Sequence, residues 1–188
     1  MRILAITLTV LAALSLAGCA AQDPAKDRDV AGLTMALMAL GPDIDPEEAA
    51  RAARISYDYP LRLREEYQVS DPPIVHNSKV NMGLRPRGLC WQWAEDMEAR
   101  LKAENFQTLQ IHRAIANSDV AFRIDHSTAL ISRRGETMYE GIVVDPWRYG
   151  GALYWSTPQA DKSYKWRPRR EVLEEKRQRL QSRARRAR

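Results

Sequence analysis

Histidine and cysteine are scarce in this chain, which has three histidines and two cysteines among its 188 residues. They are scattered instead of grouped at the spacing of a zinc site, so we expect neither a metal nor another cofactor. Long apolar runs are also missing, because nothing in the middle of the chain approaches the roughly 20 apolar residues that cross a bilayer. The composition, 45% apolar and 28% charged, is typical of one globular domain with additional ends.

The N-terminus has the features of an export signal. Met1-Arg2 precedes a short apolar run that ends in Leu16-Ala17-Gly18-Cys19, and this run is too short to span a membrane. Its last four residues resemble the lipobox of bacterial lipoproteins. The resemblance implies that residues 1–18 are a signal peptide and that Cys19 carries the lipid; the alternative is an uncleaved apolar N-terminus. Ala20, where some lipoproteins have Asp, implies a cell-envelope protein anchored on the periplasmic side, at the outer rather than the inner membrane.

Positive charge is concentrated at the other end of the chain. Residues 165–188 contain 11 Lys and Arg against three Glu, although the whole chain carries only +5. We therefore expect a lipidated linker over residues 19–28, one domain over residues 29–166 and a basic tail over residues 167–188, the tail being a solvated helix or disordered. Nucleic acid is a poor partner for an exported protein despite this tail.

The first part of the domain is predicted to be helical. Apolar residues recur at helical spacing from Val30 to Leu40. Asp45-Pro46 then supplies an N-cap and a first-turn proline for a second helix, which we expect to end near Tyr57 because Tyr59-Pro60 interrupts the pattern. A short separate helix is expected just beyond Pro60. The prolines after Ser70 predict an irregular loop over residues 70–86.

Cys90 stands where the next helix is predicted to begin. Apolar residues recur at helical spacing from Cys90 to Lys102, and Gly88 permits a tight approach to the first turn. The unpaired N–H groups of a helix N-terminus carry partial positive charge, which favours a thiolate. If Cys19 carries lipid, Cys90 has no disulfide partner, so it is either a buried inert residue or a reactive nucleophile.

Three strands are predicted after this helix. Residues 108–116 alternate, with Leu109 and Ile111 on a buried side and His112 on a solvated side. Residues 125–132 and 139–146 form a hairpin if Gly135-Glu136 is a two-residue turn, and that turn would place His126 directly opposite Asp145. Such a contact is either part of a catalytic site or a structural ion pair between neighbouring strands.

Aromatic residues are frequent near these positions. Trp91 and Trp93 follow Cys90, and Trp147 follows Asp145. Together they predict the lining of a substrate cleft, with ordinary core packing as the alternative. Further along, the two turn glycines Gly150 and Gly151 precede a short aromatic strand over residues 152–155.

The order of these motifs resembles the transglutaminase-like branch of the papain-like cysteine enzymes. The resemblance rests on Gly88-Leu-Cys90-Trp91, Asp125-His126-Ser and Val144-Asp145-Pro146-Trp147. It implies an α+β fold, in which N-terminal helices precede a cysteine-bearing helix packed on a small antiparallel sheet. It also implies that Cys90 is the nucleophile, His126 the base and Asp145 the residue that orients the histidine. The donor to the oxyanion stays open between Asn77, Asn81 and the Cys90 N–H.

Two functions follow from this sequence. The first is a lipid-anchored thiol enzyme that hydrolyses or transfers amide bonds in a peptide or cell-wall peptide, through a Cys90-His126-Asp145 triad. The second is a non-catalytic transglutaminase-like lipoprotein that binds a partner in the envelope, with its basic tail on an anionic surface. Reactivity of Cys90 separates them.

Overall fold

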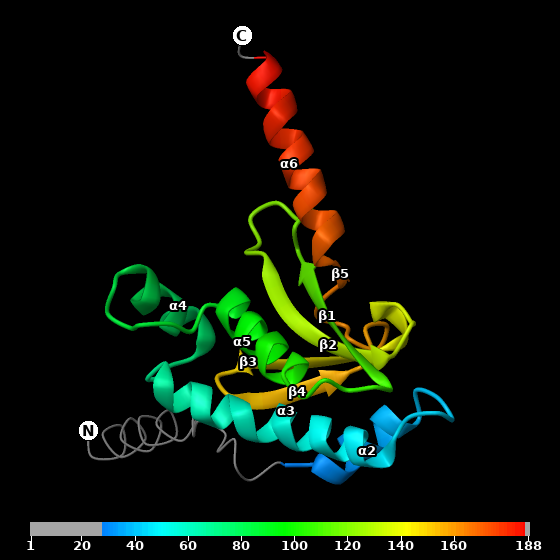
Figure 1. Ribbon diagram of the computed structural model, residues 1–188. Helices are drawn as coiled ribbons and strands as arrows, with labels where there is room; N and C mark the ends of the chain where they lie inside the picture. Colours follow the sequence, from blue (N-terminus) through cyan, green and yellow to red (C-terminus); the bar gives the residue numbers. More distant parts are fainter. Residues whose placement is uncertain (1–27, 187–188) are drawn as a thin grey trace, which may run out of the picture.

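The computed structural model describes residues 28–186 and has the expected α+β architecture, with five α-helices around a five-stranded antiparallel sheet (Figure 1). Residues 1–18, predicted to be a signal peptide, and the predicted lipidation site Cys19 lie outside the described residues. Within residues 28–186 no helix is both long enough and apolar enough to cross a bilayer.

The first two helices follow the sequence pattern, with one correction. Helix α2 (Val30–Met38) and helix α3 (Pro46–Glu66) each begin after an aspartate that caps backbone N–H groups. The predicted interruption at Pro60 is wrong, because α3 continues through it. A proline inside a helix costs about 3 kcal/mol. Buried residues on both sides of Pro60, Tyr57 and Leu63 among them, offset that cost by packing on the core.

A short helix replaces the loop predicted over residues 70–86. Helix α4 (Pro73–Asn81) begins at the second of two consecutive prolines. Proline at the first helical position is compatible with a helix, because its missing N–H would have no acceptor there. We predicted a loop because we interpreted the prolines only as breakers, and α4 has little amphipathic pattern to counter that interpretation.

The sheet has the order β4-β3-β2-β1-β5, and each neighbouring pair is antiparallel. Its strands are β1 (Leu109–Ala116), β2 (His126–Arg133), β3 (Ile142–Tyr149), β4 (Ala152–Ser156) and the two-residue β5 (Arg167–Pro168). Strand β1 agrees with the prediction, and so does the short aromatic strand after the glycine turn, whose Gly150 and Gly151 both have positive φ.

The connection between β2 and β3 differs from the predicted two-residue turn. A 3-10 helix, η1 (Met138–Glu140), capped by Thr137, lies between the strands. The observed register pairs Ala129 with Val144 and Ile131 with Ile142, which is offset by two residues from the register that would pair His126 with Asp145. Because side chains alternate along a strand, an offset of two leaves both residues on the same face of the sheet. They are therefore diagonal neighbours instead of direct partners.

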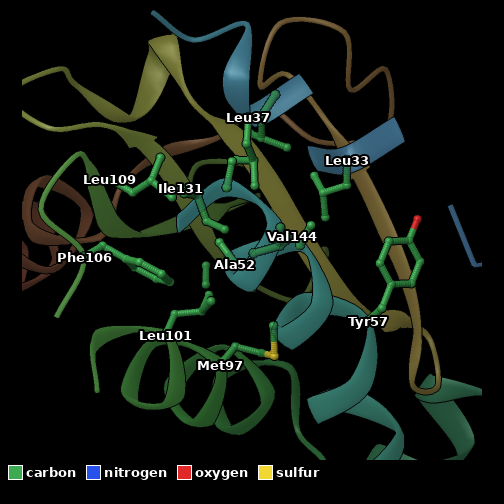
Figure 2. Packing of buried hydrophobic residues seen from close by; sticks show 14 of the residues in the cluster. Leu33, Leu37, Ala52, Tyr57, Met97, Leu101, Phe106, Leu109, Ile131 and Val144 are labelled. Atoms are coloured by element: carbon green, nitrogen blue, oxygen red, sulfur yellow. The ribbon is translucent and has the colours of Figure 1, made fainter. Parts of the chain in front are cut away.

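The main core fills the space between the helices and one face of the sheet (Figure 2). Helix α5 (Cys90–Lys102) has the predicted bounds and turns Met97 and Leu101 toward this core. There they pack with fully buried residues of the other helices and of the sheet, namely Leu33 of α2, Ala52 of α3 and Ile131 of β2. Packing α5 in this way fixes where its first residue, Cys90, lies relative to β2 and β3.

A second buried cluster covers the other face of the sheet, so the side of β1 that is predicted to be solvated is partly covered. Ala114 and Leu130 pack there with Trp166, and β5 adds to the sheet edge beside β1. Helix α6 (Arg169–Arg186) continues from β5 and projects away from the body (Figure 1). Its first turns are attached, since Val172 is buried. The predicted domain end at residue 166 is thus too early, because β5 and the first turns of α6 also pack on the domain.

Candidate functional site

The turn that leads into Cys90 is held by side chains from two helices. Gly88 has φ +129°, and its N–H donates to Gln92 Oε1 at 2.9 Å while its carbonyl accepts from Trp93 Nε1 at 3.0 Å. Buried His76 of α4 contacts the same turn, with Nε2 donating to the Arg87 carbonyl at 2.9 Å. These bonds determine the direction from which the chain enters α5.

Cys90 is the first residue of α5 and is 6% exposed. It is the only cysteine in the described part of the chain and forms no disulfide there. Its Sγ donates to the Asp125 carbonyl at 3.5 Å, so the thiol lies against the residue that precedes His126. As the first helical residue, Cys90 also has a backbone N–H without an acceptor inside the helix.

His126 and Asp145 are in direct contact despite the changed register. His126 Nε2 donates to Asp145 Oδ2 at 2.6 Å, and both side chains are almost fully buried. The other ring nitrogen, Nδ1, is buried and has no hydrogen-bond partner among the described residues. Since Nε2 is occupied by the carboxylate, Nδ1 is the nitrogen available to a thiol.

The charges around His126 favour its protonated form. Burial by itself lowers the pKa of His126, but the charge and hydrogen bond of Asp145, with a further contribution from adjacent Cys90, outweigh burial and raise the pKa to about 9. A histidine with this pKa is largely an imidazolium at neutral pH, the form that pairs with a thiolate. The three side chains thus have the composition of a thiolate–imidazolium pair supported by a carboxylate.

Aromatic rings surround the imidazole on several sides. Ring centroids of Trp147, Tyr164 and Trp166 lie 4.6, 4.5 and 5.2 Å from that of His126. Of the three tryptophans predicted to line a cleft, Trp147 lies beside the imidazole. Trp93 is instead a core residue that packs edge-on against Tyr67, and Trp91 is exposed.

A recess of about 220 Å³ opens onto Cys90 and His126. Trp147 and Tyr164 form its aromatic side, and Ile74 and Ile124 lie at its apolar edges; Asn117, Arg123 and Asp125 complete it. Asp125 is paired with Lys176 of α6. Arg123 forms no ion pair with any residue between 28 and 186, so the recess presents a positive charge.

The two asparagines considered as oxyanion donors have different environments. Asn77 is buried, and its Oδ1 accepts from Trp147 Nε1 at 3.1 Å, so it supports the wall of the recess. Asn81 is exposed at the end of α4.

A larger recess of about 580 Å³ lies away from Cys90, between β1 and α6, and is lined by several arginines and His112. His112 is half-buried instead of solvated, and its Nε2 bonds to Ser132 Oγ at 2.8 Å. Neither recess holds a metal-binding group, since no three His, Cys, Asp or Glu side chains cluster suitably within residues 28–186.

Sequence reasoning missed two residues that contact the site from behind. Arg148 Nε donates to Asp145 Oδ2 at 3.2 Å, and Arg148 is in turn held by Asp161. Nothing in the sequence pattern links Asp161 to the site, because it lies in the irregular segment after β4. Arg148 directly follows the quoted Asp145-Pro146-Trp147 motif in the sequence, although the motif does not show which side chain Arg148 contacts.

Comparison of the chain with family models, curated proteins and solved structures gives no match.

Proposed function

We propose that this protein is a cysteine enzyme that cleaves or transfers amide bonds, with Cys90 as nucleophile, His126 as base and Asp145 as the residue that orients the base. One observation carries the proposal: His126 Nε2 is bound to Asp145 while its buried Nδ1 is left unpaired beside a thiol at a helix N-terminus. A transglutaminase-like core is part of this proposal, as the motif order first suggested.

The chemistry follows from these atoms. His126 Nδ1 takes the proton of Cys90, and the thiolate attacks an amide carbonyl to form a C–S bond. The resulting oxyanion is stabilised by the Cys90 N–H. When the C–N bond breaks, Nδ1 returns its proton to the departing amine and a thioester remains. Attack by water then gives hydrolysis, and attack by another amine gives transfer.

The recess favours a peptide that combines an apolar residue with a carboxylate. Ile74 and Ile124 offer apolar contact at its edges, and Arg123 offers a positive charge without an internal partner. A cell-wall stem peptide has carboxylates close to its amide bonds, which suits this charge. The same proposal places the enzyme at the bacterial envelope through a lipidated Cys19, where such a substrate is found.

The test is the rate at which iodoacetamide alkylates Cys90 in the folded protein. Trypsin releases residues 88–100 as a peptide with Cys90 as its sole cysteine, so mass spectrometry separates it from Cys19. We expect rapid labelling at pH 7 in the wild type and at least tenfold slower labelling in His126→Ala, since the base sustains the thiolate. His112→Ala is the matched control and should label like the wild type.

Equal rates in wild type and His126→Ala, or labelling only after unfolding, would contradict the proposal. Either result would favour the second function, a non-catalytic envelope module that binds a partner.

A further inference from the structure

One carboxylate oxygen of Asp145 accepts hydrogen bonds from both His126 and Arg148. Its Oδ2 accepts from His126 Nε2 at 2.6 Å and from Arg148 Nε at 3.2 Å, and the Arg148 backbone N–H reaches Oδ1 at 3.4 Å. The carboxylate is only 1% exposed. Its direction is therefore fixed by His126 and also by Arg148, the residue three positions further along β3.

Arg148 is itself immobilised. Its NH1 and NH2 donate to the two oxygens of Asp161 at 3.2 and 2.7 Å, and the side chain of Asp161 is inaccessible to solvent. The guanidinium also lies over the rings of Tyr154 and Tyr164, 3.7 and 4.7 Å from their centroids. A bidentate ion pair between aromatic rings gives a planar guanidinium one orientation.

Trp166 connects this second ion pair back to the imidazole. Its Nε1 donates to Asp161 Oδ2 at 2.9 Å, and its ring packs against His126. The groups Trp166, Asp161, Arg148 and Asp145 therefore form a closed circuit of contacts that begins and ends at His126. Of the residues in this circuit, only His126 lines the recess; the other four lie outside it.

The charges in this circuit are balanced. Two carboxylates, Asp145 and Asp161, face one guanidinium and one imidazole that becomes a cation when it takes the thiol proton. Without Asp161, the Arg148 charge would remain uncompensated beside Asp145 and would oppose that proton transfer. Without Arg148, both buried carboxylates would lose their guanidinium partner.

We propose that Arg148 and Asp161 are positioning residues of the site: Asp161 fixes and neutralises Arg148, and Arg148 in turn directs the Asp145 carboxylate toward His126 without reducing its support of the imidazolium. The inference rests on the proposed function for its catalytic meaning, but the contacts exist whether or not Cys90 reacts.

The test measures the titration of His126 by NMR of the three histidine rings, with His126 assigned by its absence in His126→Ala. At an effective dielectric of about 20, a unit charge within about 10 Å of a titrating group shifts its pKa by about one unit or more. Asp161→Asn removes a negative charge but keeps an acceptor for Trp166, so the pKa of His126 should fall by about that amount. Arg148→Gln keeps an N–H donor for Asp145 but removes the positive charge, so it should raise the pKa of His126, and the double variant should return the pKa toward the wild-type value.

Opposite shifts from two neighbouring variants, cancelling in the double variant, are not expected from a loss of packing alone. Other charged or titratable groups on the elements around His126 stay unchanged in these variants; they are Cys90, Arg123, Asp125, Tyr164 and the Asp125 partner Lys176. Asp43→Asn, which breaks the exposed pair with Arg133 at the far end of β2, is the matched control and should shift nothing.

An unchanged titration in Asp161→Asn, or a fall in both single variants, would overturn the inference. If Arg148→Gln does not fold, Asp161→Asn against Asp43→Asn decides alone. Repeating the titration in Cys90→Ser separates the two proposals, because the charge effect of Asp161 must persist there even if alkylation shows that Cys90 is inert.

Discussion

Replacing Gly88 with alanine should damage both the stability of the fold and the reactivity of Cys90. Gly88 has φ +129°, a conformation that residues with a side chain rarely adopt. An added Cβ would also lie 2.3 Å from His76 Nε2 and 2.5 Å from His76 Cδ2, far inside van der Waals contact. His76 has little freedom to retreat, since it is 1% exposed and bound to the Arg87 carbonyl.

The cost has two separable parts. The backbone conformation contributes about 1–3 kcal/mol. Displacing His76 breaks its hydrogen bond to Arg87 and leaves Nε2 buried without a partner, as Nδ1 of the same ring already is, which adds about 1–3 kcal/mol. We therefore expect Gly88→Ala to lower the free energy of unfolding by about 4 kcal/mol.

Urea unfolding measures this, with Gly135→Ala as the matched control. Gly135 also has a positive φ, +87°, but an added Cβ there meets no atom within 4 Å. Its cost should be the backbone part alone. Removing the imidazole in the double variant His76→Ala/Gly88→Ala should make the combined loss smaller than the sum of the single losses. If Gly88→Ala costs no more than Gly135→Ala, His76 does not restrain the turn before Cys90.

Three further predictions concern stability. Glu48 accepts the backbone N–H groups of Gln107 and Thr108 at 2.5 and 2.8 Å, so Glu48→Gln should cost about 2 kcal/mol in urea unfolding, whereas Glu47→Gln should be neutral. Deleting residues 177–188 should leave the unfolding midpoint unchanged, whereas Val172→Ala should lower the free energy of unfolding by about 1–2 kcal/mol, because that side chain is 1% exposed. The pKa of His126 is raised from 6.5 to about 9, so protonation of this residue stabilises the folded state by about 3 kcal/mol. That contribution is complete below pH 6.5 and is lost as the pH rises through 9. Over this range the free energy of unfolding should therefore fall more steeply with pH in the wild type than in His126→Ala, and equal slopes would contradict the prediction.

The sequence predicts those parts of the fold that depend on local periodicity. Helix α5 begins at Cys90 and ends at Lys102 as its apolar spacing indicates, and Asp45 caps α3 as predicted. Periodicity could not show that α3 continues through Pro60, because burial against distant residues decides that. Nor could it show α4, whose residues have little amphipathic pattern and whose value to the fold lies in the contact of His76 with the turn before Cys90.

The site illustrates the same limit. The predicted hairpin register is wrong by two residues, yet His126 and Asp145 are still in contact. Side chains alternate along a strand, so a register offset by an even number of residues keeps two side chains on the same face of the sheet. Arg148 and Asp161 could not be predicted, since their pairing joins β3 to an irregular segment 13 residues away and leaves no repeat in the sequence. Tertiary packing alone brings them together.

In the proposed mechanism, the surroundings of the thiol favour proton transfer from Cys90 to His126 although both groups are buried. Cys90 Sγ donates to the Asp125 carbonyl at 3.5 Å, a weak bond for a weak donor, while His126 Nδ1 is buried and has no hydrogen-bond partner among residues 28–186. Leaving such an atom unpaired costs about 1–3 kcal/mol. Transfer of the thiol proton satisfies Nδ1 and creates an imidazolium that Asp145 already faces, and the thiolate it leaves lies at the positive end of α5. The cost of separating charge is thus offset by groups that are in place before any substrate arrives.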